Sequence, residues 1–96
     1  MNVKLIRMSS GEDIVTTVVN DGIEFITIRD AIVAIPTSQG KVGFAPWSPL
    51  VSKENEEIKV RKDFLVYIAE VNSDILDQYK QMFSVIATPE KKLILQ

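Results

Sequence analysis

The hydrophobic and polar positions of this chain follow a strand-like pattern over most of its length and a helical pattern near its C-terminus. Between residues 12 and 19 a run of β-branched side chains favours a strand, because such stiff side chains suit a pleated surface. Asn20-Asp21-Gly22 is typical of a tight hairpin turn, since these residues tolerate a positive φ. Arg29-Asp30 breaks the next apolar run, and Pro36 ends it. The predicted strands cover residues 2–8, 12–19, 23–28, 31–35, 58–63 and 64–71.

These predicted strands are apolar on both faces for much of their length. A sheet with one solvated face would alternate more regularly, so the pattern favours a barrel, a sandwich, or a sheet whose second face is covered. Ile23, Phe25 and Thr27 share one face of their strand, and we expect that face to lie in the core. Pro46 and Pro49 interrupt residues 41–51, which favours a long loop or an edge hairpin there.

A single amphipathic helix is predicted over residues 73–87. Ser73 is a suitable N-cap, and Asp74 and Asp77 suit the positive end of the helix dipole. The apolar stripe needs a surface to cover, and we expect the sheet to provide it. At 100° per residue, the stripe comprises Ile75, Leu76, Tyr79, Met82, Phe83 and Ile86. The chain is therefore expected to be one domain, with strands in residues 1–71, the helix in 73–87 and a tail in 88–96.

Composition narrows the possible chemistry. The 96 residues contain no Cys and no His, which removes disulfides, the usual zinc ligand sets and the catalytic triads. We expect no enzyme, no cofactor and no metal, and we interpret the acidic residues Glu54, Glu56 and Glu57 as a solvated surface. The net charge of −2 disfavours a sequence-independent nucleic-acid binder, although Lys and Arg number 11. No apolar run is long enough to span a membrane and the N-terminus does not resemble a signal peptide, so a cytoplasmic location is expected.

Two stretches of the chain carry a resemblance to a known family. Gly11-Glu12-Asp13-Ile14-Val15 opens the first stretch and Asp30-Ala31 closes it. In the second, Val60-Arg61-Lys62 precedes Leu65-Val66-Tyr67-Ile68. This order resembles the Sm-like family of Sm, Lsm and bacterial Hfq proteins, especially the small divergent versions found in bacteriophage genomes. The resemblance implies a mainly β fold: a strongly bent five-stranded small barrel with a long loop between strands 3 and 4, followed here by the C-terminal amphipathic helix.

The same resemblance implies a nucleic-acid site. Asp21 matches the pocket Asp of the family and Arg61 matches the signature Arg, whereas Ile23 falls at the position of the base-stacking residue. Phe25 stands where the family has a base-reading Asn, and Lys62 stands where it has a Gly. Arg61 and Lys62 would concentrate positive charge around a pore in a ring of copies. The alternative is a solvated strand end, with Ile23 and Phe25 as core residues.

Strand edges predict self-association. An open barrel leaves two edges with unpaired backbone groups, and head-to-tail pairing of such edges closes into a ring when the rotation permits it. The resemblance implies a homo-oligomer of about five to seven copies. Trp47, flanked by Pro46 and Pro49, would contact a partner protein or anchor its loop on the barrel. The strand residues expected at contacts between copies are Val60, Leu65, Val66 and Tyr67.

Two functions follow from this pattern. The first is a ring that binds RNA or another single-stranded nucleic acid through Arg61 and Lys62. The second is a structural ring that contacts proteins and binds no nucleic acid, which the missing base-reading Asn and the acidic balance of the chain favour.

Overall fold

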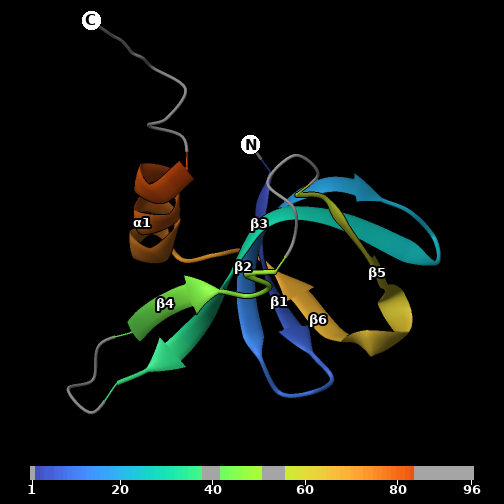
Figure 1. Ribbon diagram of the computed structural model, residues 1–96, viewed down its shortest axis with the longest axis horizontal. Helices are drawn as coiled ribbons and strands as arrows, with labels where there is room; N and C mark the ends of the chain where they lie inside the picture. Colours follow the sequence, from blue (N-terminus) through green and yellow to red (C-terminus); the bar gives the residue numbers. More distant parts are fainter. Residues whose placement is uncertain (1, 38–41, 51–55, 84–96) are drawn as a thin grey trace, which may run out of the picture.

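The computed structural model describes residues 2–37, 42–50 and 56–83. It contains six β-strands, one 3₁₀ helix and one α-helix, shown in Figure 1. The elements are β1 (Val3–Met8), β2 (Asp13–Asp21), β3 (Phe25–Pro36), β4 (Val42–Pro46), β5 (Ile58–Arg61), η1 (Lys62–Phe64), β6 (Leu65–Ala69) and α1 (Ser73–Phe83). The expected end of the helix at residue 87, Ile86, the tail 88–96 and Glu54 lie outside the described residues. The mainly β fold with a C-terminal helix is confirmed.

Three details differ from the expected elements. Residues 23–28 and 31–35 belong to one long strand, which starts at Phe25. The expected long loop carries β4, an edge strand paired with β3, and Pro46 is tolerated because it ends that strand. The strand expected over residues 58–63 ends at Arg61, where η1 turns the chain towards β6.

A bend in β3 changes the partner on one of its edges. Its first part pairs with β5 over Phe25–Ile28, and its last part pairs with β4 over Ile32–Pro36. Between them Asp30 has a positive φ of 54°, and the register with β2 shifts beside it. Such a bulge bends a strand and increases its twist. The break at Arg29-Asp30 in the sequence pattern therefore marks this bend.

The sheet is curled because its two ends are joined by a short link. The hydrogen-bonded order β5-β3-β2-β1-β6 would place β5 and β6 about 19 Å apart in a flat sheet. Three residues of 3₁₀ helix rise only about 6 Å, so the ends must approach each other. Backbone hydrogen bonds hold the link on both sides: Lys62 N–H donates to Glu24 C=O at 2.9 Å, and Ser9 N–H donates to Phe64 C=O at 2.7 Å.

Apolar side chains cover both faces of this curled sheet, as the sequence pattern indicated. The inner cluster brings together residues of β1, β2, β3 and β5, namely Ile6, Met8, Ile14, Val18, Ile26, Ile28 and Val60. The outer cluster comprises Val3, Val15, Ile32 and Tyr79. The helix α1 supplies Tyr79 and packs Ile75, Leu76 and Phe83 against the same cluster. The expected contact between the helix stripe and the sheet is confirmed, except that Met82 lies exposed.

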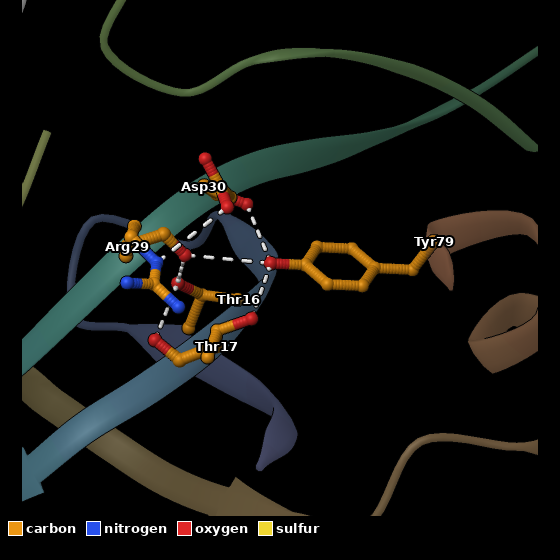
Figure 2. A network of polar contacts seen from close by, with 5 residues as sticks. All are labelled: Thr16, Thr17, Arg29, Asp30 and Tyr79. Carbon is orange, nitrogen blue, oxygen red and sulfur yellow. Dashed lines mark hydrogen bonds and ion pairs between the residues drawn. The ribbon is translucent and has the colours of Figure 1, made fainter. Parts of the chain in front are cut away.

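The Tyr79 hydroxyl ties α1 to the bend of β3 (Figure 2). Tyr79 is completely buried, and its hydroxyl donates to Asp30 C=O at 2.9 Å and lies 2.8 Å from the Thr17 hydroxyl. The Thr16 hydroxyl donates to Arg29 C=O at 2.8 Å. Burial is the main cause that raises the pKa of Tyr79 to about 12, so the phenol remains a donor at neutral pH. These hydroxyls give hydrogen-bond partners to the two carbonyls at the bulge, those of Arg29 and Asp30.

The ionised form of the Asp30 side chain is disfavoured in the folded chain. Burial, and then the nearby Glu56 carboxylate, raise the pKa of Asp30 above its ordinary value of 3.8. Because the folded chain then binds the proton more tightly than the unfolded chain, Asp30 favours folding below pH 3.8, and this contribution is lost as the pH rises through the raised pKa.

We therefore expect Asp30→Asn to increase the free energy of unfolding at pH 7 and to leave it nearly unchanged at about pH 3. Asn tolerates the left-handed backbone at this position, so the substitution removes the charge without adding strain. Urea unfolding at both pH values measures the effect, with the exposed Asp77→Asn on α1 as the matched control. A variant that is less stable than the wild type at pH 7 would contradict this assignment.

No helix in the described ranges is long and apolar enough to cross a membrane.

Candidate nucleic-acid interface

The residues singled out by the resemblance come together at one end of the sheet. Phe25, at the start of β3, lies opposite Arg61 in the register between β3 and β5. The Lys62 ammonium forms an ion pair with Asp21, at the end of β2. Ile23 lies in the turn between β2 and β3. The turn and the start of η1 are fixed to each other by the hydrogen bond from Lys62 N–H to Glu24 C=O.

The orientation of β3 at this end differs from the expected one. Ile26 and Ile28 lie opposite Val60 and Ile58, and both isoleucines are buried in the inner cluster. Alternation therefore turns Phe25 to the other face, where it is half-buried. The Ile23 side chain is 95% exposed. The expectation that Ile23 and Phe25 lie in the core was wrong, and both present apolar surface near the basic residues.

Lys59, Arg61 and Lys62 lie at the same end of the sheet as Phe25, and each ammonium or guanidinium group has a ring or carboxylate neighbour. The Lys59 ammonium lies 4.9 Å from the centroid of the Phe25 ring, a cation–π distance. The Arg61 guanidinium is 3.1 Å from an Asp63 oxygen, and both side chains are largely exposed. Exposed ion pairs contribute at most about 1 kcal/mol. A phosphate group can therefore compete with the carboxylates for these cations at low cost.

Sequence reasoning missed Lys59 as a member of this interface. Its alternation with Arg61 on the predicted strand 58–63 was a usable signal, because both residues then share one face of the strand. The pairing of β5 with β3, which places Lys59 over Phe25, could not be seen from local pattern.

Apolar side chains lie exposed along β6 and the link that precedes it. Phe64, Val66, Tyr67 and Ile68 are all exposed, with Val66 at 62%. In the described part of the chain β6 pairs with β1 alone and β5 pairs with β3 alone. Each of these strands therefore has a second edge whose outward N–H and C=O groups have no strand partner among those residues.

Of the residues expected at contacts between copies, some are exposed in the structure and others are buried. Val66 and Tyr67 are exposed on β6, whereas Leu65 is half-buried against the inner cluster. Val60 is buried in that cluster, because its strand turns it inward opposite Ile26. The expectation that Val60 offers its side chain to a neighbouring copy is corrected accordingly.

Trp47 lies against the sheet. Its side chain is half-buried and packs on the inner cluster, its backbone N–H donates to Ala31 C=O at 3.0 Å, and its indole N–H donates to Glu12 at 3.4 Å. These contacts favour the interpretation of Trp47 as a loop anchor over that of a partner contact.

A scan against protein-family models and a search of curated proteins each found no match to this chain.

Proposed function

We propose that this chain is an Sm-like protein that assembles into a homo-oligomeric ring and binds RNA or another single-stranded nucleic acid. The curled order β5-β3-β2-β1-β6, with β5 and β6 joined by one short turn, supports the bent five-stranded barrel that the resemblance implies. In this proposal β4 is an addition within the connection between β3 and β5.

The proposed ring forms by pairing the outer edge of β6 in one copy with the outer edge of β5 in the next. Both edges have unpaired backbone groups within the described residues, and such groups are ready templates for another strand. The exposed Val66, Tyr67 and Ile68 would become buried in this arrangement. Burial of apolar surface contributes about 25 cal/mol per Å², so the interface would gain free energy from side chains as well as from backbone hydrogen bonds.

One observation carries the proposed nucleic-acid site: the exposed Ile23, the half-buried Phe25 and three cations share one end of the sheet. Phe25 and Ile23 offer surfaces on which bases could stack, and stacking tolerates any base. Lys59, Arg61 and Lys62 lie beside them and could contact phosphates. Repetition of this end around a ring would raise the local positive potential above that of one copy.

Fluorescence anisotropy with uridine-rich and adenine-rich single-stranded oligonucleotides tests this site. We expect binding at low salt whose affinity falls steeply as salt rises, because each neutralised phosphate releases counterions. Arg61→Ala should weaken binding to both oligonucleotides and reduce the salt slope by roughly 0.7 for each phosphate that the protein no longer neutralises. Lys80→Ala, which removes one positive charge from α1, should leave the slope unchanged. Absence of binding to either oligonucleotide at low salt would exclude this function.

A second function remains supported by the local charges. Lys62 is paired with Asp21 and Arg61 with Asp63, so the carboxylates oppose the positive potential at this end. A ring that serves as a protein scaffold would retain its assembly and bind no oligonucleotide. Measuring particle mass and oligonucleotide binding on the same sample separates the two functions.

A further inference from the structure

A cavity of about 300 Å³ lies at the bend of β3, away from the residues of the proposed nucleic-acid site. Four segments surround it: the bend itself, the residues after β4, the start of β5 and the end of α1. Its walls are mainly apolar and include Ile32, Pro46, Ile58 and Phe83. Its polar side chains are Asp30, Ser48 and Glu56. This volume is at the lower end of the range for small-molecule pockets.

The two carboxylates make the cavity electronegative. Asp30 is partly buried, and the Glu56 carboxylate beside it adds a second negative charge at the same cavity. Arg29 contributes the nearest described cation, with its Nε 3.7 Å from an Asp30 oxygen, but its side chain is 46% exposed. A pair at that distance and exposure compensates the Asp30 charge only weakly.

We propose that this cavity binds an organic cation, an ammonium or guanidinium group carried on a short aliphatic body. The cation would lie between Asp30 and Glu56, where charge-assisted hydrogen bonds are available. The aliphatic body would lie against Ile32, Ile58 and Phe83. A phosphate or carboxylate ligand would be repelled by the two acids, and a neutral ligand would leave Asp30 with only its weak pair to Arg29.

A metal ion fits this cavity poorly. Hard cations take six or more oxygen ligands, and most of these walls are carbon. Within the described residues no group of three Asp, Glu, His or Cys side chains is placed to hold a metal. An organic cation needs fewer polar contacts and uses the apolar walls.

The fold holds the cavity open through α1. Tyr79 fixes the Asp30 carbonyl, while Phe83, one turn further along the same helix, lines the cavity and lies 4.7 Å from the Tyr79 ring centroid to centroid. The position of Asp30 at the cavity is therefore set by helix packing before any ligand arrives. This preorganisation lowers the cost of binding.

Amide NMR titration of the full chain tests the proposal with butylammonium and butylguanidinium as cationic probes and 1-butanol as the neutral one. We expect saturable amide chemical-shift changes at Asp30, Ile32 and Ile58 with both cations. The binding of 1-butanol should be weaker by at least about tenfold. Asp30→Asn and Glu56→Gln should each weaken the binding of both cations by about tenfold or more and leave the binding of 1-butanol unchanged. Asp77→Asn, an exposed carboxylate on α1, is the matched control.

The cationic group could belong to a free small amine or to a basic side chain of a partner protein. Comparison of butylammonium with N-acetyl-lysine N-methylamide separates these sources, because tighter binding of the capped amino acid indicates a partner's side chain. Equal affinity for 1-butanol and butylammonium would overturn the proposal, as would cation affinity unchanged in both Asp30→Asn and Glu56→Gln. Neither outcome depends on the proposed ring or on nucleic-acid binding.

Discussion

Tyr79→Phe is expected to lower the free energy of unfolding by about 1–3 kcal/mol, although it retains the whole aromatic ring. The hydroxyl is buried with the Thr17 hydroxyl and the Asp30 carbonyl. Its removal leaves those buried groups without a partner, and an unsatisfied buried polar group costs more than a hydrogen bond contributes. Tyr79→Ala should cost about 3–5 kcal/mol, because it also creates a cavity beneath α1.

Urea unfolding at one fixed protomer concentration measures this effect, since assembly makes stability depend on concentration. A double-mutant cycle with Thr17→Val isolates the hydroxyl pair. The combined variant should be destabilised by less than the sum of the two single variants, because Thr17→Val removes a group that Tyr79→Phe would leave unsatisfied. Thr27→Val serves as the control for the change from Thr to Val. A Tyr79→Phe variant within about 0.5 kcal/mol of wild type would contradict the assigned role.

Val66→Lys is expected to abolish the assembly and yield a monomer or an aggregate. Val66 lies exposed on β6 at a register shift, where no β1 residue faces it, so the fold of one copy should tolerate the change. In the proposed contact between copies, the introduced ammonium would be buried without a partner, which is strongly unfavourable. Val66→Pro should have the same effect, because proline removes a backbone donor from the edge.

Val19→Lys provides a matched control. Val19 is also an exposed valine at a register shift, but it lies on β2, which takes no part in the proposed contact between copies. Size-exclusion chromatography with light scattering should therefore give the wild-type mass for Val19→Lys and a smaller particle or a precipitate for Val66→Lys. Equal masses for both variants would place the contact elsewhere.

Local signals in the sequence were sufficient for most strands and for the helix, but the expected N-cap was wrong: the Asn72 side chain, not that of Ser73, accepts from Ile75 N–H at 2.9 Å. Asn20-Asp21-Gly22 predicted a hairpin, and the structure has one, in which Gly22 N–H donates to Phe25 C=O at 2.9 Å. The expected positive φ was wrong: Asn20 and Asp21 extend β2, the turn covers residues 22–24, and none of these residues has a positive φ. The sequence could not decide between a loop and an edge hairpin at β4, because proline interrupts the pattern and only pairing with β3 settles the question. The inward face of β3 was misassigned, because both faces are apolar and the choice depends on β5.

Only part of the candidate site could be predicted from the sequence. The resemblance placed Asp21, Phe25, Arg61 and Lys62 in one site, and the structure brings them together. Local pattern could not have done so, because the pairing of β3 with β5 joins segments far apart in the chain. The cavity beside Asp30 had no sequence signal, since its walls come from four separate segments. Tyr79 was recognised as an apolar stripe residue, whereas its hydroxyl partners arise from the bulge in β3.

Sedimentation velocity of the wild-type chain at micromolar concentration tests the proposed assembly most directly. We expect a single species whose mass is about five to seven times the 10.8 kDa of one chain. A particle with the mass of one chain at that concentration would contradict the pairing of β6 with β5 between copies and the ring that follows from it.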